Sequence, residues 1–337
     1  MFSTKKGNMF ALFFIIHFIV GSYIVYFIID AVPALDSVIV NIGLSQLILV
    51  FLPALYYFIF FKTPVKETFH FNKPRLVNLI LSALLAISTI PFVMLINLIS
   101  QFFVKQALGD TLEMITEENF FLALLVIAVF PGIFEELIAR GIILSHYKHK
   151  KFLVTSTMSG FFFGMMHLNI NQFLYAFFLG FIFSIVVHIT GSIFCSMIMH
   201  FLINGFNLGL AFLAQSEAFQ ALADMQGAND VLETMDQTQI LIQALPGVFI
   251  LVVLSLPFAL ALLYALAAYN NKTELLFKNA KSHLFFTNEA SEKLVTLEEA
   301  FEGDEVMMPE AKQPVITISM VLAILIFLAI SIRTELL

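Results

Sequence analysis

The sequence predicts an all-α, polytopic integral membrane protein with about nine transmembrane helices and a polar intramembrane site. Of its 337 residues, 60% are apolar or aromatic, 40 are Phe and only 12% are charged. A typical soluble domain carries about 25% charged residues, so this chain has too few to cover a water-facing exterior. The mean hydropathy of +0.95 also indicates a surface that meets lipid.

Nine apolar runs approach the roughly 20 residues that a helix needs to cross a bilayer. The first run follows two lysines and is too long for the apolar part of a signal peptide, so we expect an uncleaved helix. The expected spans lie at about 9–29, 38–61, 76–100, 119–145, 152–168, 171–189, 191–213, 243–269 and 315–334.

These spans divide the chain into an N-terminal group of three helices, a core of four helices and a more polar C-terminal part. The polar part contains an acidic loop, a helix, a mixed-charge insert and a last helix. The expected boundaries are 1–118, 119–213, 214–242, 243–269, 270–314 and 315–337, in that order.

The distribution of Lys and Arg predicts a cytoplasmic N-terminus, because positive residues are retained on that side during insertion. This orientation places 14 of the 17 Lys and Arg residues inside. The 214–242 loop, which has acidic residues but no Lys or Arg, then lies outside, and the 270–314 insert lies in the cytoplasm. We expect a multi-pass protein of the cell membrane, surrounded by membrane lipids, with an insert that could bind a partner protein. The scarcity of Arg beside Lys and Phe favours a bacterial source.

Composition and motifs exclude several classes of protein. The net charge of −7 argues against a nucleic-acid partner, because phosphate binding needs a basic face. The single Cys195 cannot form an internal disulfide bond. The chain has no HExxH helix, GxxxxGK loop or GxSxG elbow. Their absence argues against the commonest membrane metalloprotease helix, an ATPase and a serine hydrolase of the elbow type.

The fourth expected span carries three ionisable residues, Glu135, Glu136 and Arg140. Charged side chains inside hydrocarbon cost several kcal/mol, so such residues are candidates for function and need partners. Glu136 and Arg140 stand four apart on one helical face, where they can partly neutralise each other. The preceding Pro131 and Gly132 predict a kink that begins a new helical segment near the carboxylates.

Two further spans carry polar residues at similar depth. The fifth span ends at His167 after Gly160 and Gly164, which would let a neighbouring helix approach closely and bring His167 near the fourth span. The seventh span carries His200 and Asn204 on one face. The helical rise puts these groups and the carboxylates at overlapping depths of about 14 to 24 Å. We therefore expect a common polar cavity that opens toward the cytoplasm.

Two carboxylates, two imidazoles and an amide are the groups that peptide hydrolysis within a membrane would need. A carboxylate can act as general base on water, alone or with a metal ion, and imidazole or amide groups can stabilise the oxyanion. Glu and His also bind Zn²⁺, so Glu135, His167 and His200 form a candidate zinc site.

The three polar segments resemble the signature of the CAAX protease and bacteriocin-processing family, also called CPBP or Abi, which includes the type II CAAX prenyl endopeptidases. The family pattern is EExxxR, FxxxH and HxxxN on separate helices, and the resemblance covers about residues 119–213. All three parts occur here in the family's order, so the joint match is far more specific than any one part. The matching residues are Glu135, Glu136, Arg140, Phe163, His167, His200 and Asn204.

This resemblance implies an intramembrane protease that acts on a peptide or a membrane-anchored protein. It implies that Glu135 and His167 activate water and that Arg140 orients the glutamates. It also implies that His200 and Asn204 stabilise the oxyanion or complete a metal site, with Zn²⁺ as the expected metal in that case. Eukaryotic members trim prenylated CAAX proteins, while bacterial members are linked to peptide processing, bacteriocin immunity and membrane-protein regulation. The 214–242 loop, the 270–314 insert and the last span depart from smaller members and leave the substrate open.

Two other functions fit the same residues. A proton-coupled transporter would use the carboxylates and histidines as a proton relay. A noncatalytic scaffold would regulate a partner enzyme through the 270–314 insert.

Each candidate also has a structural interpretation: an ionic knot for the glutamates and Arg140, core positions for the histidines, and an interhelical hydrogen bond for Asn204. His146 and His149 are expected in a solvated turn near lipid headgroups. Phe161 to Phe163 are expected mainly in packing or lipid-facing positions, with a groove for a prenyl or acyl chain as the alternative. We assign no role to His17 and His188.

Overall fold

The computed structural model describes residues 2–104, 109–226, 234–277 and 314–336, and within these ranges the chain forms helices and no strand. The all-α prediction is therefore confirmed. Most of the 270–314 insert and the centre of the 214–242 loop lie outside the described residues. The N-terminal part contains α1 (Thr4–Ala31), η1 (Pro33–Leu35), α2 (Val38–Ser45), η2 (Gln46–Phe51), α3 (Leu52–Phe61), α4 (Val65–Phe69) and α5 (Leu76–Ser100).

The remaining elements belong to the central core and the C-terminal part. α6 (Gly109–Thr116) leads into the core. The core contains α7 (Phe120–Leu124), η3 (Leu125–Val129), α8 (Phe130–Glu136), η4 (Leu137–Ile143), α9 (Leu144–His146), α10 (Phe152–Met165), α11 (Ile170–Thr190) and α12 (Ile193–Ala214). The C-terminal part contains α13 (Glu217–Met225), α15 (Gln237–Tyr269), α16 (Glu274–Phe277) and α18 (Ile318–Leu336).

Seven helical segments in the described ranges are long and apolar enough to cross a membrane. They agree with seven of the nine expected spans within a few residues, so a protein with several membrane-crossing helices is confirmed while the count of nine is not. The other two are the shorter apolar helices Phe152–Met165 and Ile318–Arg333. The 14 residues of α10 extend about 21 Å, less than the roughly 30 Å of a hydrocarbon core.

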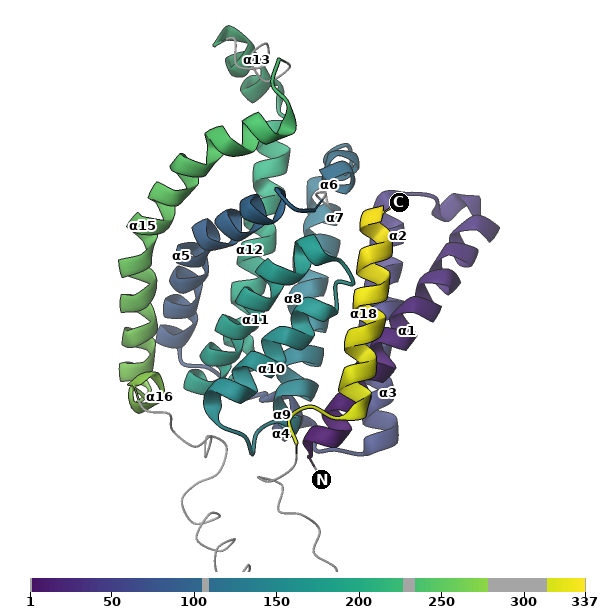
Figure 1. Ribbon diagram of the computed structural model, residues 1–337, viewed down its shortest axis with the longest axis vertical. Helices are drawn as coiled ribbons and strands as arrows, with labels where there is room; N and C mark the ends of the chain where they lie inside the picture. Colours follow the sequence, from purple (N-terminus) through teal and green to yellow (C-terminus); the bar gives the residue numbers. More distant parts are fainter. Residues whose placement is uncertain (1, 105–108, 227–233, 278–313, 337) are drawn as a thin grey trace, which may run out of the picture.

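Figure 1 shows α8, α10, α11 and α12 in the centre of the bundle, flanked by α5 and α15 on one side and by α1 and α18 on the other. The N-terminus lies at the same end of the bundle as α4, α9 and α16, and α18 ends at the opposite end (Figure 1). The curvature of α15 has a local cause, because Pro246 and Pro257 inside the helix each remove a backbone hydrogen bond.

Two glycines fix the position of α10. A Cβ atom on Gly160 would come within 2.8 Å of the carbonyl oxygen of Phe177, and one on Gly164 within 2.8 Å of the carbonyl oxygen of Phe173. The two glycines therefore allow the close helix approach that the sequence predicts, and the helix that packs against α10 is α11. His167 follows directly after α10, in the turn that leads into α11, so this contact holds the imidazole in place.

The fourth span runs from Phe120 to His146 as one continuous helical rod with two π-helical segments, η3 and η4, on either side of α8. Pro131 lies at the start of α8, where its missing N–H is tolerated because η3 precedes it. Glu136 is the last residue of α8. Because π-helical turns rotate the following side chains relative to an α-helix and often occur at functional sites, η4 sets the direction of the residues after the glutamates.

The N-terminal end of the bundle is closed by a buried polar cluster, which corrects the expectation of a solvated turn for His146. This side chain is only 1% exposed. The backbone N–H of Ser3 donates to His146 Nδ1 at 3.1 Å, so in the neutral ring Nε2 carries the proton toward the Tyr57 hydroxyl oxygen, 3.0 Å away. The turn is buried because the first residues of the chain fold over it.

The same region anchors the last helix. Asn8 Nδ2 donates to the carbonyl oxygen of Val315 and to the hydroxyl of Thr317, each at 3.0 Å, and the Tyr147 hydroxyl donates to Asn8 Oδ1. Since Asn8 is on α1, these bonds attach the residues just before α18 to the N-terminal helix.

Candidate active site

The two adjacent glutamates at the end of α8 lie in different environments. Glu136 is completely buried, whereas the side chain of Glu135 is 13% exposed. Consecutive residues on a helix point in directions about 100° apart, so the two carboxylates face different neighbours. This difference divides the site into a buried ionic cluster around Glu136 and a more open carboxylate at Glu135.

Arg140 and His200 together hold Glu136. Arg140, one turn further along, donates through Nε and Nη2 to both oxygens of the Glu136 carboxylate. His200, on α12, places Nδ1 3.0 Å from Glu136 Oε1. A carboxylate accepts hydrogen bonds, so Nδ1 of His200 carries a proton and donates it. The arrangement explains how three ionisable side chains can be buried together, because every charge has a partner.

Two aromatic rings complete the surroundings of Arg140. Its guanidinium carbon lies 4.2 Å from the centre of the Phe163 ring and 5.2 Å from the centre of the Phe183 ring. Ring faces are negative and attract a cation, most strongly where water is excluded. Phe163 is thus part of the site rather than a general packing residue, and it also meets the His200 ring edge-on with ring centres 5.6 Å apart.

Glu135 faces groups from several other helices. Gln46, the first residue of η2, donates from Nε2 to Glu135 Oε1 at 3.2 Å. His200 Nε2 lies 3.9 Å from the other oxygen, Oε2. Glu135 is also close enough to His167 and to Tyr175 of α11 to act on both electrostatically. The structure therefore brings Glu135, His167 and His200 into one region, as the sequence predicts, and adds Gln46 and Tyr175.

The hydrogen bond of His167 determines which ring nitrogen is available for chemistry. Nδ1 lies 2.9 Å from the carbonyl oxygen of Phe163, one turn earlier in the chain. A carbonyl oxygen only accepts, so Nδ1 carries the proton and Nε2 of the neutral ring has the lone pair. This is the form of imidazole that accepts a hydrogen bond or a proton from water.

Asn204 is the one candidate that the structure does not bring to the carboxylates. Its Nδ2 atom donates to the carbonyl oxygen of Ile127 at 3.0 Å. Ile127 lies in η3, about two helical turns before Glu135. The amide thus satisfies a backbone oxygen in a π-helical segment and joins α12 to the fourth span.

Of the three residues of the candidate zinc site, Glu135 and His200 lie at a separation that two ligands of one zinc ion can have. Zinc needs three or four donors within about 2.3 Å of one point. The Glu135 and His200 donor atoms are 3.9 Å apart. In the part of the chain that the structure describes, no three His, Cys, Asp or Glu side chains gather so that they could hold a metal ion. Zinc dependence stays a prediction, and the chemistry proposed below uses the side chains alone.

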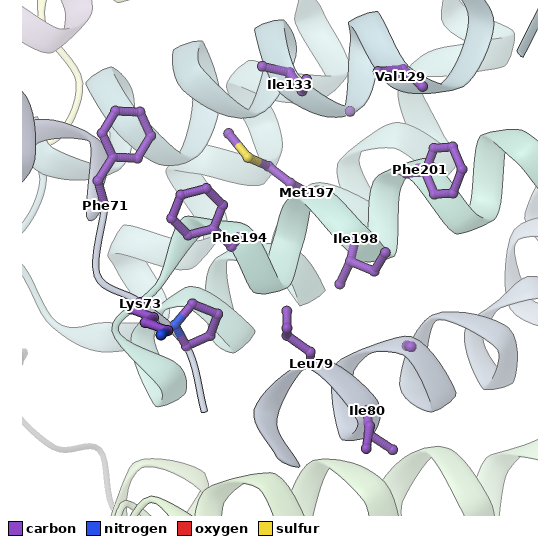
Figure 2. A pocket seen from close by; sticks show the side chains of 13 residues that line it. Phe71, Lys73, Leu79, Ile80, Val129, Ile133, Phe194, Met197, Ile198 and Phe201 are labelled. Carbon is purple, nitrogen blue, oxygen red and sulfur yellow. The ribbon is translucent and has the colours of Figure 1, made fainter. Parts of the chain in front are cut away.

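An apolar groove of about 920 Å³ lies between α8 and α12 on one side and the first turns of α5 on the other. Figure 2 shows Val129 and Ile133 on one side, Leu79 and Ile80 on the other, and Met197 between them. Other lining residues close its ends, with Lys73 at one and Phe201 at the other (Figure 2). The groove reaches the same stretch of α8 and α12 that carries the glutamates and His200.

Comparison with known proteins confirms the family resemblance for the central part of the chain. Residues 117–206 match the family model of the Rce1-like type II CAAX prenyl endopeptidases. No curated protein and no solved structure matches the chain. The match supports an intramembrane endopeptidase in general. The matched segment contains Glu135, Glu136, Arg140, His167, His200 and Asn204.

Proposed function

We propose that the protein is an intramembrane endopeptidase in which Glu135 activates water to hydrolyse a peptide bond of a membrane-associated protein or peptide. The observation that carries this proposal is the difference between the two glutamates. Glu136 is completely buried and bonded to Arg140 and His200, while Glu135 is partly exposed and faces polar groups from other helices. A general base needs an accessible carboxylate with free acceptor capacity, and Glu135 has it.

The reaction begins with a water molecule between Glu135 and His167. One hydrogen of the water moves to Glu135 while the water oxygen bonds to the scissile carbonyl carbon. His167 Nε2 accepts a hydrogen bond from the other hydrogen and so fixes the orientation of the attacking lone pair. Glu135 then gives its proton to the departing nitrogen as the C–N bond breaks, which leaves a new carboxyl group and a new amine.

His200 stabilises the negative oxygen that develops during the attack. Its Nδ1–H is held by Glu136, which fixes the ring and directs Nε2 toward the Glu135 side of the site. When the ring carries both protons, Nε2–H donates to the oxyanion. With Arg140 and a protonated His200, the two positive charges balance the two carboxylates, so the site has no net charge inside the membrane. In this mechanism Asn204 supports η3 and does not contact the substrate.

The apolar groove along α8 and α12 is a suitable place for the lipophilic part of a membrane-anchored substrate. Its lining is almost entirely apolar, and it includes Gly132 and Met197, which lie about one helical turn before Glu136 and His200. Filling it should therefore weaken substrate binding more than it slows the chemical step.

Ala83→Trp should raise KM for a membrane-anchored peptide by about tenfold, because the indole occupies the groove that Ala83 lines. The matched control is Leu84→Trp, since Leu84 is the next residue of α5 and is 46% exposed on another face. Steady-state cleavage by the purified variants in liposomes measures both effects. An unchanged KM in Ala83→Trp, or an equal rise in Leu84→Trp, would contradict the role of the groove.

Chelation should leave the cleavage rate unchanged, because in the proposed mechanism Glu135 activates water without a metal ion. The rate is measured before and after extended dialysis against a strong chelator, with the metal content followed in parallel. If chelation abolishes activity and added Zn²⁺ restores it, the protein binds the zinc ion that the family resemblance implies, and the metal-free mechanism is contradicted.

Cleavage and transport assays on the same liposomes distinguish the proposal from its main rival. Purified protein is incubated with a panel of membrane-anchored peptides, with and without a prenyl group, and mass spectrometry detects new termini. A protease generates products without any ion gradient. A proton-coupled transporter instead shows flux that depends on a pH gradient and yields no products.

A further inference from the structure

Gln46 is a polar residue of the second span whose side chain reaches the catalytic glutamate. It begins η2, and its contact with Glu135 joins positions 89 residues apart in the chain. Gln46 also lies outside residues 117–206, the part that matches the endopeptidase family model. An amide inside an apolar span needs hydrogen-bond partners, and here one of them is a carboxylate.

The contact determines the orientation of the Gln46 amide. The carboxylate oxygen Oε1 of Glu135 accepts, so the Gln46 atom that lies 3.2 Å away is the donor Nε2. The amide oxygen, Gln46 Oε1, therefore points elsewhere. It is buried and has no hydrogen-bond partner among the residues that the structure describes. A buried acceptor without a partner is rare in folded proteins. This one belongs to the same amide group whose Nε2 atom donates to the proposed base, Glu135.

A peptide bond that enters this site brings a hydrogen-bond donor that needs an acceptor. Within a membrane helix each backbone N–H is bonded inside the helix, and unwinding for cleavage releases it where no bulk water is present. The N–H of the scissile bond is also the nitrogen that must receive a proton from Glu135. An acceptor beside Glu135 would satisfy the N–H and bring the departing nitrogen to its proton donor.

We propose that Gln46 positions the substrate by connecting Glu135 to the scissile peptide bond: Nε2 donates to Glu135 and Oε1 accepts from the scissile N–H. The inference rests on the proposed function and identifies a residue that orients the leaving group. Gln46 exchanges no proton. The proton that the departing nitrogen gains comes from Glu135, which took it from water. The hydrogen that the scissile nitrogen donates to Gln46 Oε1 stays covalently bound to that nitrogen throughout the reaction.

The test compares two substrates that differ only at the scissile bond, an amide and the corresponding ester. The ester lacks the N–H, so it cannot use Gln46 Oε1. Gln46→Leu removes both functions of the side chain and is expected to lower kcat for the amide by about 100-fold but for the ester by about tenfold or less. A role in packing alone would slow both substrates by the same factor, and that result would overturn the inference.

A second variant separates the two ends of the side chain. Gln46→Glu keeps an acceptor oxygen and loses the donor to Glu135, so both substrates should slow by a similar factor. This variant also provides the test if Gln46→Leu does not fold. A change in the ratio of kcat for the amide to kcat for the ester in Gln46→Glu would then contradict the role of Gln46 Oε1 as the acceptor of the scissile N–H. Ser45→Ala, one position earlier, is the matched control, because the Ser45 hydroxyl donates to Asn41 and not to Glu135; it should retain wild-type rates on both substrates.

The failure of this inference can be distinguished from the failure of the proposed function. If the wild-type protein cleaves neither substrate, the endopeptidase proposal falls and Gln46 has no leaving group to orient. If it cleaves both and Gln46→Leu slows them equally, the endopeptidase stands and the inference fails. Size-exclusion profiles of the purified variants show whether each one folds.

Discussion

Glu135→Gln should lower kcat for peptide cleavage by about 1,000-fold or more, because the amide has nearly the same shape but cannot take a proton from water. Binding should change little, since the Gln side chain still fills the position. The measurement is the steady-state cleavage of a membrane-anchored peptide by purified protein in liposomes.

Glu117→Gln is the matched control for this variant. Glu117 is an exposed carboxylate just before α7, and its replacement should leave the rate unchanged. If Glu135→Gln retains more than about a tenth of the wild-type kcat, the assignment of Glu135 as the base is contradicted. Such a result would direct attention to His167, the other group that faces the water.

Arg140→Met should destabilise the folded protein by about 3 to 5 kcal/mol, because it leaves the Glu136 carboxylate buried without its main partner. Both side chains are 0% exposed, so water cannot replace the lost bonds. His200 is the remaining partner within hydrogen-bond distance of Glu136 Oε1. Thermal or denaturant unfolding in detergent measures the change.

The double variant Glu136→Leu with Arg140→Met tests the cause of that loss. It removes both charges and should recover much of the stability, since a buried ion pair replaced by apolar residues often costs little. It should remain inactive because His200 loses the group that fixes its ring. If Arg140→Met alone is as stable as wild type, Glu136 is not held as an ion pair.

The helical fold could be predicted from the apolar runs alone. A membrane helix satisfies its own backbone hydrogen bonds, so length and hydropathy are sufficient to find it. The expected spans 38–61 and 76–100 coincide with the bounds of the helices there. α10 is the informative exception, since its 14 residues are positioned by the contact of Gly160 and Gly164 with α11 rather than by a length that crosses the bilayer.

The ionic part of the site was also predictable. The spacing of four residues predicts that Glu136 and Arg140 share one helical face. The HxxxN pattern identifies His200 as a further site residue, at a similar depth in the membrane. Both signals are local or follow from a known pattern. Asn204 shared the same pattern but faces Ile127, because a helical face is wide enough for two residues one turn apart to have different neighbours.

The positions of other buried side chains, inside the site and outside it, depend on contacts between residues that are far apart in the chain. The FxxxH pattern marks Phe163 among the 40 Phe residues, but only the fold shows that its ring lies against the Arg140 guanidinium. His146 is flanked by Lys-rich sequence, and its burial depends on Ser3 and Tyr57 from distant parts of the chain. Gln46 had a usable signal, since an amide within an apolar span needs a partner, but only the fold shows that the partner is Glu135.

The most direct test of the central claim, that Glu135 acts as a base on water, is a single turnover in heavy-oxygen water with protein in excess over substrate. General-base catalysis places one heavy oxygen in the new carboxyl terminus during the first turnover, and Glu135→Gln yields no product on the same timescale. Transfer of an unlabelled oxygen from the protein to the first product would show instead that the carboxylate attacks the peptide bond itself and would contradict the account.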